Sequence, residues 1–319
     1  MYHKKKVLLG GFNKKQILLL KKENKKIVFF EHKTNQKKID KIDAFVSISR
    51  SGFEDFYYND LHKYKSSISW VHIAGAGIDK YFRNNELSKK CNVTSMKILQ
   101  GPQVADHAMG LLLCLTRNIN LVIKNGPFHK FKNRAIELRN KNALIIGYGG
   151  VGKCVAERAR GFGLNVDVID PHYSPISNVI NNFYLVEEYK KALKDKDVIF
   201  YTLPLTIKTG KMFNEGIVKY IKKGAFIINV SRGAVICYDT LYKYLKNNHL
   251  RGAGSDVIDV EPIKKNHKLL KLSNFIFTPH IAGTSDRLSG RNFKLIESNI
   301  SRFANNGELI NLVNIRRGY

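Results

Sequence analysis

The feature that most constrains this chain is a glycine-rich segment near its middle, residues 147–152, with the sequence GYGGVG. The apolar run 143–146 before it is typical of a buried strand, and the residues from Lys153 onward are compatible with a helix. In such a strand–turn–helix unit, glycines at the first, third and sixth positions permit a tight turn, open the backbone to a pyrophosphate and let the helix pack on the strand. Exposed amides and the helix dipole favour an anion there. The segment therefore predicts a dinucleotide-binding unit.

An acidic residue follows at the position where the ribose of a bound dinucleotide is expected. Asp170 comes 18 residues after Gly152, at the end of a predicted strand over 164–169. A carboxylate there accepts hydrogen bonds from both ribose hydroxyls of NAD and repels the extra phosphate of NADP. The next residues are Pro171 and His172 rather than arginine. The sequence thus predicts NAD in preference to NADP, with a structural turn and a capping aspartate as the alternative.

Polar residues follow four later strands of the same series. Residues of this kind are Thr202 and Pro204 after 198–201, Ser231 and Arg232 after 226–230, Asp256 and Glu261 after 252–255, and Thr278 and His280 after 275–277. Ligands of open α/β sheets bind outside the carboxyl ends of the strands. We therefore expect Arg232, Glu261 and His280 at one edge of a sheet. Each of them alone is explained as well by a surface charge, a loop or a structural residue.

The whole chain alternates strand-like and helix-compatible segments, which predicts an α/β fold with parallel sheets. In the first hundred residues, strands are expected at 6–9, 27–30, 44–49, 70–74 and 91–94. A helix is expected over 103–118 and a connection over 125–134. Further strands are expected at 143–146, 164–169, 198–202, 225–230, 252–257 and 275–278, and helices at 151–160, 215–221, 240–245 and 285–304, with a short segment at 187–193. The last residues are too few to form a domain, so we expect them to pack on the first one.

The charge balance is strongly basic, with 54 Lys and Arg against 26 Asp and Glu and a formal net charge of +28. Such a charge suggests nucleic-acid binding. The lysines are spread along the chain, however, and no arginine-rich tract, RNA-binding aromatic signature or zinc finger accompanies them. We therefore expect no nucleic-acid partner and interpret the charge as a field that attracts anionic substrates and cofactors. The alternative predicts a steeply salt-dependent affinity for DNA or RNA.

Cysteine and histidine spacing excludes other classes. The four cysteines, none of them in a C-x-x-C pair, are Cys91, Cys114, Cys154 and Cys237. We therefore expect reduced thiols and a cytoplasmic location. No metal-ligand spacing occurs, so no metal is predicted. No apolar run approaches the roughly 18 residues of a membrane span, and the basic start of the chain leads into a short strand and a turn rather than a secretory signal.

Four segments, in this order, resemble the D-isomer-specific 2-hydroxyacid dehydrogenase family, in the short form of phosphoglycerate dehydrogenases and glyoxylate or hydroxypyruvate reductases. They are 147–152 (GYGGVG), 229–234 (NVSRGA), 255–262 (SDVIDVEP) and 278–283 (TPHIAG). The resemblance is weakest over residues 1–65. It implies a Rossmann-type NAD-binding domain over residues 104–284, inserted into a flavodoxin-like substrate domain formed by residues 1–103 and 285–319. It also implies a homodimer built largely on the NAD-binding domains.

The resemblance assigns catalysis to Arg232, Glu261 and His280. When a 2-oxo acid is reduced, negative charge develops on the carbonyl oxygen, and a protonated His280 can donate its proton there. The acidic neighbour Glu261 would favour the protonated ring and fix its orientation. The forked guanidinium of Arg232 can bind the substrate carboxylate and polarise the carbonyl.

The resemblance also implies the binding residues. Small residues after the fourth strand let the main chain reach the substrate carboxylate. The implied substrate-binding residues are Gly75, Ala76, Gly77 and Arg232. Asp256 corresponds to a residue on the nicotinamide side of the cofactor. The full set of expected cofactor-binding residues is Gly147, Gly149, Gly150, Val151, Gly152, Asp170, Thr202, Pro204, Val230, Ser231, Arg232, Asp256, His280 and Gly283.

Together these features predict an NAD-dependent oxidoreductase that interconverts a small anionic 2-oxo acid and its D-2-hydroxy acid by hydride transfer, acting on a CH–OH group. Glyoxylate, hydroxypyruvate and 3-phosphoglycerate-type acids are candidate substrates, and phosphite oxidation is an outside option. A non-catalytic, NAD-sensing interaction protein of the same fold, like the corepressors that resemble this family, is the alternative. The complete set of Arg232, Glu261 and His280 favours the enzyme, because a sensor need not keep all three.

Overall fold

The chain divides into two compact units in the computed structural model, which describes residues 4–33, 39–78, 81, 91–126, 135–173, 175 and 177–314. Met1–Leu99 and Ser285–Tyr319 form the first unit, and Gln100–Thr284 form the second. The first boundary falls after Leu99, before the position 103/104 expected from the sequence. The helix that begins at Gly101 belongs to the second unit from its first turn, because a Cβ on Gly101 would lie only 2.6 Å from the carbonyl oxygen of Gly150.

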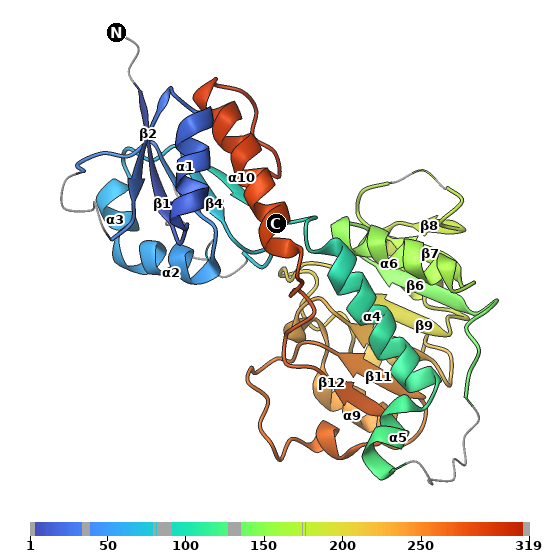
Figure 1. The fold of residues 1–319 in the computed structure, drawn as a ribbon. Helices are drawn as coiled ribbons and strands as arrows, with labels where there is room; N and C mark the ends of the chain where they lie inside the picture. The colour runs from blue at the N-terminus through green and yellow to red at the C-terminus, as the bar shows by residue number, and fades with distance from the viewer. Residues whose placement is uncertain are drawn as a thin grey trace. The chain divides into compact units, whose positions relative to one another are not determined.

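The first unit is a five-stranded parallel sheet with helices on both faces (Figure 1). Its strands are β1 (Lys5–Gly10), β2 (Ile27–Glu31), β3 (Ala44–Ser47), β4 (Trp70–Ile73) and β5 (Asn92–Ser95). Its helices are α1 (Lys14–Glu23), α2 (Arg50–Asn59), α3 (Leu61–Tyr64) and α10 (Leu288–Ala304). The strand order β2-β1-β3-β4-β5, with every pair parallel, is the flavodoxin-like order. The flavodoxin-like expectation is therefore confirmed.

Both faces of this sheet are buried. Val7 and Leu9 of β1 pack in one core with α1 and α10, whereas Leu8 packs in another with α2 and α3. Strands that are buried on both faces are apolar along their length rather than alternating, which is why they stand out in the sequence. The residues that α10 contributes to the first of these cores are Ile296, Ile300 and Phe303. The end of the chain thus packs back on the first sheet, as expected.

The second unit is a seven-stranded parallel sheet flanked by helices. Its strands are β6 (Asn142–Ile146), β7 (Asn165–Ile169), β8 (Asn182–Tyr184), β9 (Val198–Tyr201), β10 (Phe226–Asn229), β11 (Gly252–Ser255) and β12 (Phe275–Phe277). Its helices are α4 (Gly101–Thr116), α5 (Ile119–Asn125), α6 (Gly150–Gly161), α7 (Tyr189–Ala192), α8 (Glu215–Val218) and α9 (Tyr238–Lys246), with short 3-10 helices η3 (Val186–Glu188), η4 (Gly233–Val235) and η5 (Lys268–Lys271). The order β12-β11-β10-β9-β6-β7-β8 is a Rossmann order with one added strand, and it changes direction between β6 and β9. The Rossmann expectation is confirmed.

Two elements of the second unit differ from the sequence-based expectation. The helix expected over 103–118 ends at Thr116, and Asn118, with a φ of 59°, separates it from α5. Helix α5 contains no buried residue, so it lacks the apolar stripe by which a helix is recognised. Strand β8 was also missed, because three residues at the edge of a sheet leave little pattern. Most of the expected connection, residues 127–134, lies outside the described residues.

Candidate active site

The glycine-rich turn joins β6 to α6 at the point where the strand order changes direction. Gly147 has a φ of 96°, and a Cβ there would lie 2.9 Å from the backbone of Leu203, which follows β9. A Cβ on Gly152 would lie 2.0 Å from the carbonyl oxygen of Gly147, whereas Gly149 faces open space. The first and last glycines therefore permit close packing, and the middle one leaves the turn open to a ligand. Thr202 Oγ1 donates a hydrogen bond to the carbonyl oxygen of Gly147 at 2.7 Å and ties the end of β9 to the turn.

Asp170 lies beside this turn, at the end of β7. Its Oδ2 accepts a hydrogen bond from the Tyr148 amide at 2.7 Å, and its Oδ1 accepts one from the His172 amide at 2.9 Å. The side chain is only partly buried, and each carboxylate oxygen has a further lone pair to offer. The structure thus brings together the turn and the acid that the sequence singled out, in an arrangement that fits a dinucleotide.

Glu261 and His280 lie in direct contact at the same edge of the sheet. His280 Nδ1 is 2.8 Å from Glu261 Oε2, and the two side chains are 46% and 36% exposed. The other oxygen, Glu261 Oε1, accepts a hydrogen bond from the Ile258 amide at 3.2 Å, which holds the carboxylate in place. With Nδ1 turned to the carboxylate, Nε2 is on the far side of the ring, where it can exchange a proton with a ligand.

Arg232 follows β10, and its segment packs against the loop that carries Glu261. A Cβ on Gly233 would lie 1.9 Å from the carbonyl oxygen of Ile258, so the two backbones are in close contact. The Arg232 guanidinium donates from Nη1 to the carbonyl oxygen of Ser231 at 2.8 Å. The structure therefore places Arg232 and Glu261 on adjacent loops, and the direct side-chain contact of the predicted trio is the one between Glu261 and His280.

The other residues expected to bind the cofactor lie at this edge too. Ser231 Oγ donates to Asn229 Oδ1 at 2.7 Å, and the carbonyl oxygen of Gly283 accepts a hydrogen bond from the Gln103 side chain at 3.0 Å. The partly buried members are Gly150, Val151, Pro204 and Val230. Asp256 differs from all of them, because it is 2% exposed and both of its carboxylate oxygens accept hydrogen bonds from the protein.

Sequence reasoning missed one residue of this edge. His107 Nε2, from α4, lies 2.7 Å from Thr278 Oγ1, which in turn donates to Asp256. A histidine on a largely apolar helix carries no local signal of such a contact. Its partner Thr278 is 171 residues away in the chain, so only the fold brings the two together.

The expected substrate loop follows β4 in the first unit. The Gly75 amide donates to the carbonyl oxygen of Ile73 at 2.8 Å, and the Met96 amide donates to the carbonyl oxygen of Gly75 at 3.1 Å. Gly75 is buried, and Ala76 and Gly77 are partly exposed. A Cβ on Gly75 would meet no atom within 4 Å, so packing alone does not require a glycine there.

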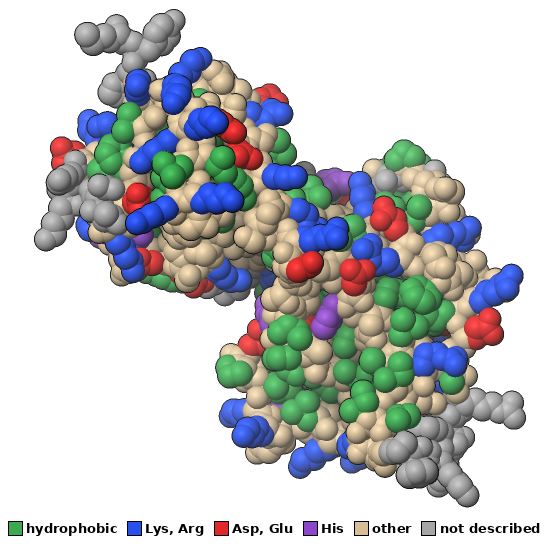
Figure 2. Space-filling view, viewed as in Figure 1, with side chains coloured by type: hydrophobic (Ala, Val, Ile, Leu, Met, Phe, Trp, Pro, Cys, Tyr) green, Lys and Arg blue, Asp and Glu red, His purple; other side chains and the backbone are tan. Residues whose placement is uncertain are grey.

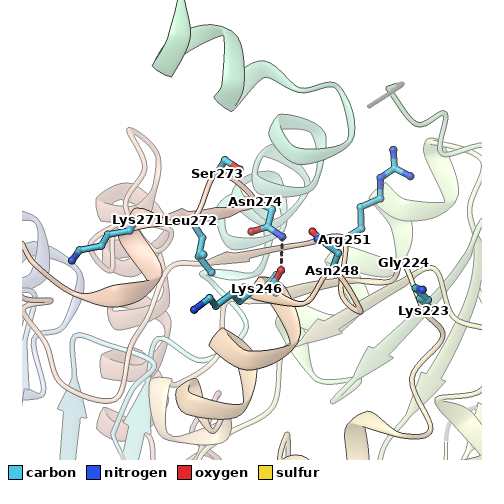
Figure 3. A pocket seen from close by; sticks show the side chains of 10 residues that line it. Lys223, Gly224, Lys246, Asn248, Arg251, Lys271, Leu272, Ser273 and Asn274 are labelled. Carbon is cyan, nitrogen blue, oxygen red and sulfur yellow. Dashed lines mark hydrogen bonds between the residues drawn. The ribbon is translucent and has the colours of Figure 1, made fainter. Parts of the chain in front are cut away.

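A basic depression of about 610 Å³ lies at the opposite edge of the second sheet, where β10, β11 and β12 begin (Figure 3). Its charged lining residues are Lys223, Lys246, Arg251 and Lys271. None of the sequence-predicted site residues lines it. In Figure 3 the four cationic side chains point in different directions rather than toward one point, so the depression is not organised around a ligand.

Metal ligands and membrane spans were also sought among the described residues. Within them, no group of three or more His, Cys, Asp or Glu side chains could hold a metal ion. No helix in the described part of the chain is both long enough and apolar enough to cross a membrane. Lysine and arginine side chains are scattered over the face shown in Figure 2, with acidic and uncharged side chains between them.

Comparison with known proteins identifies the family. A family model described as D-isomer specific 2-hydroxyacid dehydrogenase, NAD binding domain, matches residues 109–282, which lie within the second unit. The chain is 31% identical over 287 residues to D-3-phosphoglycerate dehydrogenase of Methanocaldococcus jannaschii, covering 88% of this chain and 54% of that protein. It is also 31% identical over 230 residues to hydroxypyruvate reductase of Thermotoga maritima, covering 70% of this chain and 74% of that protein.

Lengths and solved structures complete the comparison. The chain spans 40% to 54% of the length of the phosphoglycerate dehydrogenases that it matches. The structure of a D-isomer specific 2-hydroxyacid dehydrogenase from Xanthobacter autotrophicus Py2, in complex with NADPH, has a TM-score of 0.81 at 20% identity and covers 99% of both chains. At that identity it supports the fold. With the family model matched over the second unit, the chain belongs to the D-isomer specific 2-hydroxyacid dehydrogenase family.

Proposed function

We propose that this protein is an oxidoreductase that interconverts a small 2-oxo acid and its D-2-hydroxy acid with NAD. The observation that carries the proposal is the Glu261–His280 contact, at the sheet edge that also holds the glycine-rich turn and Asp170. An exposed imidazole oriented by a carboxylate is suited to donate a proton to, or accept one from, an oxygen atom of a ligand. The family membership supports the same activity.

Each residue of the proposed catalytic trio has a separate task. His280, protonated, donates its Nε2 proton to the carbonyl oxygen of the substrate as negative charge develops there. Glu261 holds the ring by Nδ1 and stabilises its charged form. Arg232 binds the substrate carboxylate through its fork of N–H groups and polarises the carbonyl. The cofactor, when bound, supplies the hydride.

The cofactor preference remains part of the proposal. The open turn at Gly149 fits a pyrophosphate, and Asp170 beside the turn fits the two ribose hydroxyls of NAD. A negative charge at this point disfavours the additional phosphate of NADP, and His172 is the basic group nearest in sequence after it. We therefore propose NAD, although the related Xanthobacter protein was solved with NADPH.

Substrate and assembly are proposed on the following grounds. The amides of Gly75, Ala76 and Gly77, after β4, would bind the substrate carboxylate. Glyoxylate, hydroxypyruvate and 3-phosphoglycerate-type acids are the candidate substrates. Helix α5 exposes aliphatic side chains, Ile123 to 79%, which supports a homodimer. The four cysteines are free, which supports a reducing location such as the cytoplasm.

A turnover screen tests this function. Oxidation of NADH is followed with glyoxylate and hydroxypyruvate, and reduction of NAD with 3-phosphoglycerate, in the unmutated protein and in Arg232→Ala. We expect turnover of at least one acid, and a kcat/KM at least ~100-fold lower in Arg232→Ala with NADH affinity nearly unchanged, because a transition-state contact is lost. Arg160→Ala, an exposed site on α6, is the matched control. NADH binding without any turnover would instead support the sensor.

A further inference from the structure

Asp256 makes an unusual number of hydrogen bonds to the loop that carries His280. Its Oδ1 accepts from Thr278 Oγ1 at 2.6 Å and from the Ile281 amide at 3.0 Å, and its Oδ2 accepts from the Ala282 amide at 2.9 Å. Its backbone carbonyl oxygen accepts from the His280 amide at 2.8 Å. One buried residue at the end of β11 therefore holds the loop on both sides of His280.

The backbone of His280 needs such support. Its φ is 56°, in the left-handed region that residues with a side chain rarely occupy. A conformation of this kind persists only when surrounding contacts determine it. The hydrogen bonds from Thr278, Ile281 and Ala282 to Asp256 supply those contacts. They set the direction in which the His280 ring leaves the backbone, toward Glu261.

His107 extends this support to helix α4. Its Nε2 is 2.7 Å from Thr278 Oγ1 and 3.5 Å from Asp256 Oδ1. A threonine hydroxyl has one hydrogen, and here it is donated to Asp256, so the bond with His107 requires that Nε2 donates. The three side chains thus form a chain of donors, from His107 to Thr278 to Asp256, that ends on a buried carboxylate. Donors of this kind are what a buried charge requires.

We propose that His107 and Thr278 are positioning residues, which act through Asp256 to hold His280 against Glu261. This inference rests on the proposed function, because its kinetic consequence is slower proton transfer. It also gives Asp256 a task different from the nicotinamide contact that the family resemblance implies. Asp256 fixes the loop, and His280 and Arg232 meet the ligand.

The first test compares two substitutions at one position. Thr278→Val keeps the shape of the side chain and removes the hydroxyl, whereas Thr278→Ser keeps the hydroxyl. We expect kcat to fall on the order of 10- to 100-fold in Thr278→Val, the cost of a small misplacement of a reacting group. NADH affinity and the melting temperature should change little, and Thr278→Ser should retain most of the activity. Wild-type kcat in Thr278→Val, or equal losses in both variants, would overturn the proposal.

The second test asks whether His107 works through the same chain. His107→Phe should lower kcat in the same way, and the double variant His107→Phe/Thr278→Val should be little worse than Thr278→Val alone, because one pathway has been broken twice. His249→Gln is the matched control, since His249 is a partly buried histidine whose Nε2 contacts the carbonyl oxygen of Ile221 elsewhere in this unit. Fully additive losses would show that His107 acts independently of Thr278 and would overturn the proposed chain.

A third readout separates this inference from the proposed function. The ring nitrogen NMR signals of His280, assigned by their loss in His280→Gln, report its environment without any turnover. We expect these signals to move in Thr278→Val and His107→Phe and to stay in Thr278→Ser. If the unmutated protein turns over no 2-oxo acid but the signals move as expected, the proposed function fails and the positioning stands. If the signals do not move, the positioning is wrong whatever the activity.

Discussion

His72 in the first unit and His280 in the second are both held by neighbouring side chains, but in opposite surroundings. His72, on β4, is 0% exposed, with Nδ1 2.9 Å from Thr94 Oγ1 and Nε2 3.1 Å from Asn292 Oδ1. Burial lowers its pKa from 6.5 to about 4. His280 has a side chain that is 46% exposed and contacts a carboxylate rather than neutral groups.

The contrast shows how surroundings decide what a histidine does. A buried imidazole with neutral partners keeps one charge state near neutral pH, so it serves as a cross-link. His72 links β4 to β5 and to α10, and thereby joins the two chain segments that form the first unit. An exposed imidazole beside a carboxylate is stabilised in its charged form and can reach a ligand, as proton transfer requires.

The sharpest way to break this comparison is to remove the imidazole that is assigned to chemistry. In His280→Gln, kcat should fall on the order of 10²- to 10⁴-fold, because a positioned proton donor is lost. The free energy of unfolding should change by less than about 0.5 kcal/mol, since the side chain is substantially exposed. Steady-state kinetics and urea denaturation measure the two quantities. Turnover near that of the unmutated protein would remove His280 from the mechanism.

The buried histidine should instead show itself in the pH dependence of stability. The unfolded chain binds a proton at this histidine near pH 6.5, whereas the folded first unit does so only near pH 4. The stability contribution is therefore complete above pH 6.5 and is lost as the pH falls to about 4, by an amount on the order of 3 kcal/mol.

The single tryptophan makes this measurable in the first unit. Trp70 is buried in the same network, where its Nε1 donates to Thr94 Oγ1 at 2.9 Å. Its fluorescence in urea, at a series of pH values, follows the unfolding of that unit. His72→Gln, which cannot titrate, should lose this part of the pH dependence. Equal slopes in both proteins would show that His72 is not responsible.

A third substitution separates cofactor binding from proton transfer at the edge of the second sheet. Asp170→Ala should weaken NADH binding about 10-fold and narrow the gap to NADPH, because charge-assisted hydrogen bonds to the ribose are lost and a repulsive charge is removed. Dissociation constants for both cofactors, measured by fluorescence titration, test this. The idea fails if the unmutated protein already binds the two cofactors equally well.

The sequence located the chemistry of the second unit better than its supports. The strand, glycine turn and Asp170 lie within 30 residues and carry local signals, so their arrangement was predictable. Glu261 and His280 were expected at one edge because parallel strands end together, and the structure has them in contact. Arg232 was expected at that edge for the same reason.

What escaped the sequence depends on contacts between distant residues. His107 gives no local sign of its bond to Thr278, and His72 gives none of its bond to Asn292, 220 residues away. Residues in such networks are chosen by the packing around them rather than by a neighbouring pattern. Helix α5 escaped for a different reason, since it buries no residue and therefore lacks the apolar periodicity that reveals a helix.

The most direct test of the central claim, that the Glu261–His280 pair supplies the proton, is the pH profile of kcat/KM for 2-oxo acid reduction in the unmutated protein and in Glu261→Gln. The substitution keeps the shape of the side chain and removes a negative charge at 2.8 Å from the ring. The charged imidazole then loses its partner, so the high-pH limb should move to lower pH. Superimposable profiles, with the limb in place, would contradict the account.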